Sequence, residues 1–167
     1  KENEFIVLEG DEYLSSPIDR RPKFHLYKPN IALLSGIAWD HINVFPTFDG
    51  YIEQFRIFTD SLTNGGIMVY NEEDTILKEV VESSEHTIKK YAYSTPSHII
   101  ENGITFIDTP DGQMPLEIFG DHNLQNLAGA KWICQHMGID EEDFYEAIAS
   151  FKGASKRLEK IAESQET

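Results

Sequence analysis

The strongest constraint on the fold is an alternation of short apolar runs with segments of helical period. The runs at residues 31–34, 67–70 and 87–93 have the length of strands. Helical spacing in the two stretches between them is carried by Tyr51, Phe55, Phe58 and Leu62, and then by Ile76, Leu77, Val80 and Val81. Strands that alternate with helices pair in parallel through crossover connections. The order therefore predicts an α/β fold with a mostly parallel sheet and helices on both faces.

An apolar run at residues 4–9 has the same character and ends in the carboxylate of Glu9. It predicts a further buried strand with Glu9 at its C-terminal tip. The run at 31–34 ends shortly before Asp40 and His41. Because ligands of open α/β sheets bind outside the carboxyl ends of the strands, we expect chemistry at these two strand ends.

Residues 97–119 differ in character and predict a small antiparallel β meander. Asn102-Gly103 and Asp111-Gly112 separate its apolar segments, and both pairs favour hairpin turns because their residues tolerate positive φ. The expected strands cover residues 97–101, 104–107 and 114–119.

Two helices are predicted after Gly120. Their apolar stripes are Leu127, Ala130, Cys134 and Met137 in the first, and Phe144, Ala147, Ile148 and Phe151 in the second. Asp121 and Asp140 are the expected N-caps, and Gly138 is the expected C′ glycine of the first helix. Beyond Gly153 the sequence is polar, so we expect residues 1–153 to form one domain and 154–167 a linker.

The charge of the chain excludes two classes of partner. It has 14 Lys+Arg and 29 Asp+Glu, a net charge of −15 with His neutral. Nucleic acids and anionic membranes both require a basic surface, so neither is an expected partner. Cys134 alone allows no internal disulfide, no apolar run reaches the ~18 residues of a membrane span, and the first residues do not form a signal peptide. We therefore expect a soluble cytoplasmic protein.

Glu9 and His41 are the first candidate site residues. Mg²⁺ at phosphoryl-transfer sites is held by one or two carboxylates together with substrate phosphates, and an imidazole at the second strand end could face the same crevice. With 29 acidic residues in the chain, a solvated acidic loop remains the alternative for Glu9. A structural role remains the alternative for His41, because lone histidines are more often structural than catalytic.

Asn123 and Asn126 are the second candidates. Their spacing of three places both amides on one side of a helix, where a donor and an acceptor would suit the edge of a purine base. Helix capping is the alternative for both. The chain contains no G-x-x-x-x-G-K-[ST] sequence, so a nucleotide site formed by this chain alone would lack the loop that holds a triphosphate. Cys134 lies on an apolar stripe and is expected to pack in the core.

Four motifs, taken in order, resemble the central ATP-binding domain of the Mur ligases. They are Glu9-Gly-Asp-Glu-Tyr13, Asp40-His41, Gly120-Asp-His-Asn123 with Asn126, and Ser150-Phe-Lys-Gly-Ala-Ser-Lys-Arg-Leu-Glu159. Residues 11–13, 20–24 and 156–159 are most similar to the murein-peptide ligases of that family. These enzymes join UDP-N-acetylmuramate to L-alanyl-γ-D-glutamyl-meso-diaminopimelate in peptidoglycan recycling. The resemblance implies a P-loop-NTPase-like central domain over residues 1–153 that lacks its Walker-loop portion, and a hinge at 154–167. The family's UDP-sugar domain and C-terminal domain would lie outside this chain.

The resemblance also implies roles for five residues. Glu9 would bind the Mg²⁺ that bridges the phosphates of ATP, and His41 would support that metal or the transferred phosphoryl group. Asn123 and Asn126 would contact adenine, and Arg157 would reach the phosphates or the ribose. In the implied reaction, ATP phosphorylates the muramyl carboxylate to an acyl phosphate, and the peptide amine displaces phosphate to form an amide. As one part of such a ligase, the chain alone is expected to be inactive.

Two alternatives remain open. The acceptor could be L-alanine, as in the ligases of peptidoglycan biosynthesis, because the acceptor-binding region would lie mostly outside this chain. The alternative from another class is a non-catalytic α/β module whose acidic surface binds a basic partner. Weak nucleotide binding by the complete protein would favour that module.

Overall fold

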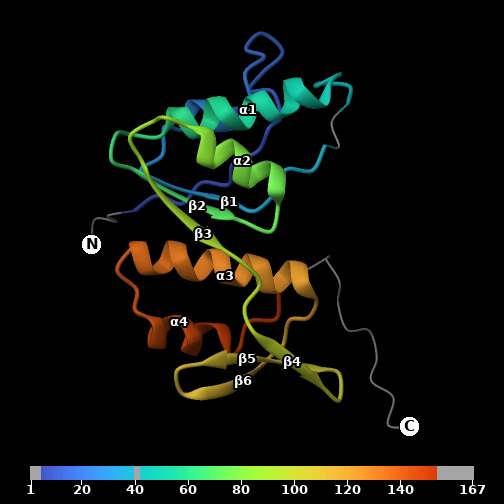
Figure 1. Cartoon of the computed structure of the whole chain (residues 1–167), viewed down its shortest axis with the longest axis vertical. Helices are drawn as coiled ribbons and strands as arrows, with labels where there is room; N and C mark the ends of the chain where they lie inside the picture. The colour runs from blue at the N-terminus through green and yellow to red at the C-terminus, as the bar shows by residue number, and fades with distance from the viewer. Residues whose placement is uncertain (1–4, 40–41, 154–167) are drawn as a thin grey trace. The chain divides into compact units, whose positions relative to one another are not determined.

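The structure is a computed structural model that describes residues 5–39 and 42–153 (Figure 1). The chain divides into two compact units, residues 1–94 and 95–167, and each unit is described by itself. The first contains a parallel three-stranded sheet with helices, and the second a separate antiparallel sheet with helices. The predicted α/β class and the predicted meander are therefore confirmed. None of the described helices is long and apolar enough to cross a membrane.

The first unit follows the predicted order of strands and helices from residue 31 onwards. Its elements are η1 (Lys23–Leu26), β1 (Ile31–Leu34), α1 (Phe48–Ser61), β2 (Ile67–Asn71), α2 (Thr75–Ser83) and β3 (Lys89–Tyr93). β2 lies between β1 and β3 and is parallel to both, with Ile67 opposite Ile31 on one side and Lys89 on the other. All three strands therefore end at the same edge of the sheet.

α1 and α2 pack on the same face of this sheet (Figure 1). Ala32 and Leu34 of β1, together with Met68 and Tyr70 of β2, point to this face because paired residues of neighbouring strands share a side. The predicted apolar stripes of both helices are buried against them. The helical spacing thus gives the correct inward face for both helices.

Each of these helices begins at a capping side chain. Thr47 Oγ1 accepts a hydrogen bond from the Gly50 amide at 3.2 Å. Asp74 Oδ1 accepts from the amides of Ile76 and Leu77 at 3.1 and 3.0 Å. Both caps satisfy N–H groups that have no partner within the helix, which fixes the first turn.

The predicted strand at residues 4–9 is wrong for the part that the structure describes. Residues 5–9 are irregular and pair with no described strand. Ile6 and Val7 are 86% and 83% exposed. A strand needs a neighbour to satisfy its backbone hydrogen bonds, and an apolar run by itself does not provide one.

The second unit is the meander followed by two helices. Its elements are β4 (His98–Glu101), β5 (Ile104–Thr109), β6 (Gly112–Leu116), α3 (Asp121–His136) and α4 (Glu141–Ile148). β5 lies between β4 and β6 and is antiparallel to both. Asn102 and Gly103 have φ angles of 53° and 77°, which confirms the predicted turn between β4 and β5. β6 lies earlier than the predicted 114–119, because pairing with β5 already begins at Gly112.

Residues of the meander and of both helices form the core of the second unit. Its buried members are Ile107, Leu116, Ile118, Leu124, Leu127 and Phe144. Ala130 and Cys134 pack against this cluster, as predicted. The outer part of the predicted α4 stripe is wrong: Ala147 is exposed, and Phe151 is 48% exposed because the helix ends at Ile148.

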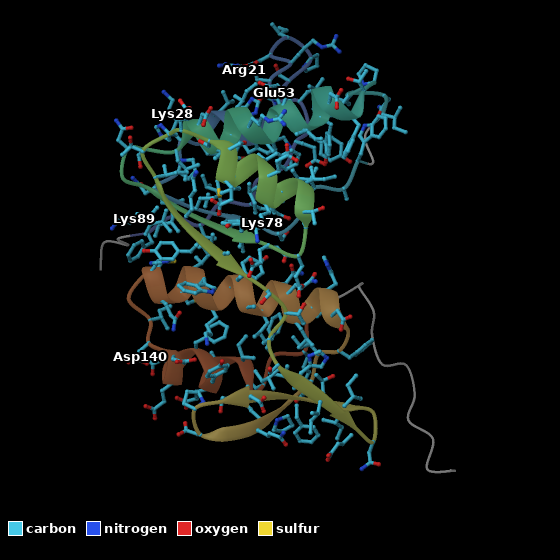
Figure 2. The ribbon with its side chains drawn as sticks, in the orientation of Figure 1. Arg21, Lys28, Glu53, Lys78, Lys89 and Asp140 are labelled. Carbon is cyan, nitrogen blue, oxygen red and sulfur yellow. The ribbon has the colours of Figure 1, made fainter. Side chains whose placement is uncertain are left out.

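The predicted ends of α3 and α4 are mostly correct. Gly138, with a φ of 87°, closes α3 in a Schellman motif in which the amides of residues 138 and 139 bond back to the last turn. Asp140 caps α4 by accepting from a backbone amide at 3.2 Å (Figure 2). The exception is Asp121: Gly120 occupies the N-cap position of α3, and no side chain caps that end.

Candidate functional site at the carboxyl edge of the parallel sheet

Two polar side chains hold the carboxyl ends of β1 and β2 together. Buried Asn71 donates from Nδ2 to the Ser35 carbonyl at 3.3 Å, and its Oδ1 accepts from the Glu73 amide at 3.1 Å. Asp74 Oδ2 accepts from the Ile37 amide at 2.7 Å, while its Oδ1 caps α2. These bonds fix the backbone that leaves β1 at the edge where ligands of α/β sheets bind.

The loop that follows leads to residues 40 and 41, so the predicted site residue His41 lies outside the described residues. Before that gap, the Ala38 carbonyl lies 3.0 Å from the Tyr51 hydroxyl. Trp39 Nε1 donates to the Phe45 carbonyl at 3.0 Å, which ties the loop together across the gap. The backbone is therefore anchored on both sides of the predicted residue.

Three carboxylates follow the N-terminal run, and their surroundings differ. Asp11 Oδ2 lies 3.1 Å from Lys23 Nζ, and its Oδ1 accepts from a backbone amide at 3.0 Å. Glu12 Oε1 lies 3.2 Å from the Tyr51 hydroxyl. Glu9 is exposed, and no described residue pairs with its carboxylate. Glu9 is therefore the carboxylate of the three that is available to a ligand.

Tyr51 brings this acidic segment and the loop before His41 together. Its hydroxyl lies within hydrogen-bonding distance of both Glu12 and the Ala38 carbonyl. The side chain is only 2% exposed and sits in the first turn of α1, so its position is set by packing. The acidic segment and the loop that ends at Trp39 are therefore joined through the Tyr51 hydroxyl.

The residues present fit a phosphate-bound Mg²⁺. Among the described residues, no three His, Cys, Asp or Glu side chains are grouped to bind a metal. Mg²⁺ needs fewer protein ligands, because one or two carboxylates, waters and substrate phosphates complete its octahedral shell. The carboxylate of Glu9, which is exposed and has no partner among residues 5–39 and 42–153, is an oxygen ligand of the kind that such an ion prefers.

The predicted adenine-binding residues Asn123 and Asn126 lie in the first turns of α3, in the second unit. Asn123 Nδ2 donates to the Phe119 carbonyl at 2.8 Å, and Asn126 Nδ2 lies 3.4 Å from His122 Nε2. The bond from Asn123 ties the start of the helix to the preceding loop. This is a structural role, which is the alternative to adenine binding for this residue. Glu9 belongs to the other unit, and Arg157 lies outside the described residues.

Two other titratable side chains in α3 have packing roles. Burial raises the pKa of the Cys134 thiol, which keeps it protonated at neutral pH and unsuited to nucleophilic attack. Burial also acts to lower the pKa of Lys131, but hydrogen bonds to Glu141 and Tyr145 outweigh it and raise the pKa overall. These bonds link α3 to α4.

Sequence reasoning missed Asn71, Asp74 and Tyr51 as residues that organise this edge. Asp74 carries a recognisable signal, because it directly precedes a segment of helical period and is a favoured N-cap residue. Asn71 directly follows the apolar run at 67–70, so it marks a third strand end. Nothing in the sequence indicates the role of Tyr51 beyond its place in an apolar stripe. Periodicity predicts that its ring is buried, but it does not predict which groups its hydroxyl contacts.

The chain resembles known proteins along nearly its whole length. The family model described as "Mur ligase middle domain" matches residues 1–134. The chain is 26% identical over 172 residues to the UDP-N-acetylmuramate–L-alanine ligase of Caldicellulosiruptor bescii, covering 96% of this chain and 36% of that protein. It is also 26% identical over 166 residues to the UDP-N-acetylmuramate–L-alanyl-γ-D-glutamyl-meso-2,6-diaminoheptandioate ligase of Escherichia coli, covering 95% of this chain and 36% of that protein. The chain thus spans about a third of the length of these relatives.

Solved structures share the fold. The crystal structure of UDP-N-acetylmuramate:L-alanyl-γ-D-glutamyl-meso-diaminopimelate ligase from Neisseria meningitides superposes with a TM-score of 0.74 at 21% identity, over 89% of this chain and 48% of that one. A structure of MurF from Acinetobacter baumannii gives a TM-score of 0.66 at 19% identity, over 85% of this chain and 33% of that one. At these identities the likeness concerns the fold alone. Because the family model covers most of the sequence, this chain belongs to the Mur ligase family and corresponds over residues 1–134 to its middle domain.

Proposed function

We propose that this chain is the middle part of an ATP-dependent amide ligase of peptidoglycan recycling. The complete enzyme joins UDP-N-acetylmuramate to L-alanyl-γ-D-glutamyl-meso-diaminopimelate. The observation that carries the proposal is the meeting of the acidic segment with the loop before His41, through Tyr51, at the carboxyl edge of a Mur ligase middle domain. The other domains of the ligase supply the UDP-sugar site and most of the acceptor site.

Within this proposal, Glu9 and His41 hold the Mg²⁺ that accompanies ATP. The unpaired carboxylate of Glu9 supports its part, because the neighbouring Asp11 and Glu12 are already engaged. Asn123 and Asn126 contact adenine, and Arg157 reaches the phosphates or the ribose. The bond from Asn123 to Phe119 uses one N–H of that amide, so its other N–H and its oxygen remain for a base.

Phosphoryl transfer requires that the reacting groups be positioned and that the charge on the phosphates be neutralised. A bound Mg²⁺ neutralises charge that develops on the phosphates during transfer. Glu9 orients that ion from the protein side, while Asn71 and Asp74 hold the backbone that carries the loop of His41. The muramyl carboxylate takes the γ-phosphoryl group, ADP leaves, and the acceptor amine then displaces phosphate from the acyl phosphate. No nucleophile from the protein is required, which agrees with the packing role of Cys134.

The acceptor is the finer part of the proposal. Residues 11–13 and 20–24 are similar to the murein-peptide ligases, and one relative with 26% identity is named for the tripeptide acceptor. The relative from Caldicellulosiruptor bescii, named for L-alanine, is equally similar, so ligation to L-alanine is the second candidate. Competition between the tripeptide and free L-alanine in the complete gene product decides between them. Formation of the tripeptide conjugate at equal acceptor concentrations is the expected result.

The metal role is tested by Glu9→Gln in the complete gene product that contains this chain. The expected result is a fall of ~100-fold or more in kcat for amide formation, because the lost ligand acts on charge that develops in the transition state. Glu101→Gln is the matched control, since Glu101 is an exposed carboxylate at the end of β4 and should leave kcat unchanged. A Glu9→Gln enzyme with nearly normal kcat removes the metal role. Failure of the unchanged protein to bind ATP would favour the non-catalytic module.

A further inference from the structure

A short loop projects from the first unit beyond α1 (Figure 1). It runs from Leu14 to Pro22, which form an isolated antiparallel bridge at its base, and we call it the 14–22 loop. Hydrogen bonds cross it at two further levels: the Ser15 amide donates to the Arg21 carbonyl at 2.9 Å, and the Ser16 amide to the Asp19 carbonyl at 3.0 Å. The loop is therefore held in one conformation by its own backbone.

Side chains add to this bracing. The Ser15 hydroxyl donates to the Arg21 carbonyl at 2.7 Å, and the Asp19 amide donates to the Ser16 hydroxyl at 2.8 Å. The guanidinium of Arg21, which Figure 2 labels, donates to both carboxylate oxygens of Asp19, at 2.9 Å from Nε and 2.7 Å from Nη2. The two-point ion pair closes the loop just below its tip.

The loop exposes two side chains that contact little of the described structure. Ile18 at the tip is 96% exposed, and Arg20, two residues further along the returning arm, is also exposed. Of the three arginines that the structure describes, Arg21 pairs with Asp19 and Arg56 pairs with Glu53. Arg20 has no hydrogen-bond or ion-pair partner among the described residues.

The chain has 29 acidic and 14 basic residues, yet no described carboxylate pairs with Arg20. A guanidinium that meets no carboxylate of its own chain keeps its five N–H donors for another molecule. Its fork matches the two oxygens of a carboxylate or a phosphate. Because the loop is braced, binding there would cost little ordering of the backbone.

The loop is attached directly to the candidate site. Its base continues into the segment that holds Glu9, and the Lys23 amide donates to the Tyr13 carbonyl at 3.0 Å below the bridge. Lys23 also pairs with Asp11 at 3.1 Å, which ties the base of the loop to the acidic segment. Arg20 lies two residues before Pro22, about 7 Å from the base along an extended arm, whereas Glu9 lies five residues before Leu14 on the other side of the base. This separation suits contact with a part of the substrate away from the reacting atoms.

We propose that Arg20 binds an anionic group of a substrate, a carboxylate of the peptide or a phosphate of the UDP-sugar, at a distance from the reacting atoms. The inference rests on the proposed function. It assigns Arg20 to substrate binding, with no part in the chemical step, and gives the 14–22 loop the task of holding it in place.

The test replaces Arg20 with Gln in the complete gene product and compares it with Arg56→Gln. Arg56 is the matched control because it is an exposed arginine on α1 that already has a carboxylate partner. For Arg20→Gln we expect KM for the tripeptide or for UDP-N-acetylmuramate to rise about tenfold or more, with kcat and KM for ATP within about twofold. The substrate whose KM rises identifies the bound group. Arg20→Lys should recover part of the loss, because it restores the charge without the fork.

Direct binding keeps this inference separate from the proposed function. Titration calorimetry of UDP-N-acetylmuramate and of the tripeptide measures affinity whether or not turnover occurs. A loss of about tenfold or more for one of them in Arg20→Gln, and none in Arg56→Gln, supports the inference even if the acceptor specificity proves different. Unchanged affinities and KM values in Arg20→Gln, or a loss confined to kcat, would overturn it.

Discussion

Asp11, Glu12 and Glu9 have the same side-chain charge within four residues of one another, yet the fold uses them differently. Lys23 lies 3.1 Å from Asp11, and the Tyr51 hydroxyl lies 3.2 Å from Glu12. Both partners come from later parts of the chain and reach the acidic segment only because η1 and α1 are packed beside it. Glu9 keeps its carboxylate free of described partners, which is the property that a metal ligand of a substrate complex needs.

The ion pair between Asp19 and Arg21 changes the pKa of the Asp19 carboxyl group. The side-chain hydrogen bonds from Arg21, and then its backbone amide, lower the pKa of Asp19 from 3.8 to about 2. Because the folded pKa is depressed, the pair contributes fully to the folded loop above about pH 3.8, and the contribution is lost as the pH falls through about 2. Asp19 lies at the surface with its side chain 35% exposed, so the effect concerns the loop and not global stability.

The expected outcome is an Asp19 carboxyl titration with its midpoint near 2, followed by carbon-13 NMR with labelled aspartate and assigned with Asp19→Asn. In Arg21→Gln the midpoint should return towards 3.8, because the main cause of the shift is removed. A midpoint near 3.8 in the unchanged protein would contradict the ion pair, and with it the bracing of the 14–22 loop.

At the scale of elements, turn residues carried the most reliable information. Asn102 and Gly103 have positive φ angles and join β4 to β5, as the Asn-Gly pair predicts. The helical stripes of α1 and α2 also point inward as predicted, because burial of one helix face follows directly from residue spacing. Strand predictions depend more on context. Residues 31–34 form β1 and pair with β2, whereas residues 5–9 pair with no described strand.

Gly103→Ala tests the turn between β4 and β5. An added Cβ at Gly103 would meet no atom within 4 Å, so the cost comes from the φ of 77° and not from a clash. We expect about 1 kcal/mol, seen as about fivefold faster hydrogen exchange of the β4 and β5 amides by mass spectrometry. Asn102→Gly is the control and should change exchange little, because glycine adopts the φ of 53° without strain. Equal exchange in Gly103→Ala and the unchanged protein would show that the turn is not under this constraint.

At the scale of the whole molecule, the residues proposed to bind the metal and the nucleotide are divided between the two compact units. Glu9, Tyr51, Asn71 and Asp74 belong to the first unit, and Asn123 and Asn126 belong to the second. The chain also spans about a third of the length of its relatives and contains no Walker loop sequence. The proposed nucleotide site would therefore depend on parts that this sequence does not contain.

We therefore expect the 167-residue chain alone to hydrolyse no ATP above background, while the complete gene product turns ATP over when both other substrates are present. The physical reason is that the β- and γ-phosphates need a glycine-rich loop of backbone amides, which this sequence does not contain. Phosphate release measured at increasing chain concentration checks this, with circular dichroism as evidence that the helices are formed. Turnover that scales with chain concentration and is lost in Glu9→Ala would show that this chain holds a complete site.

The sequence by itself determined the α/β class, the order of elements from residue 31 to α4, the turn between β4 and β5 and the inward faces of α1 and α2. These features depend on contacts between near neighbours in the chain, where residue type and spacing decide the outcome. Only the tertiary structure decided that Asn71 and Asp74 fix the end of β1, that Tyr51 links Glu12 to the loop before His41, and that the run at 5–9 stays irregular. Each of these depends on a partner distant in sequence, and the periodicity of a segment carries no information about which partner it will meet.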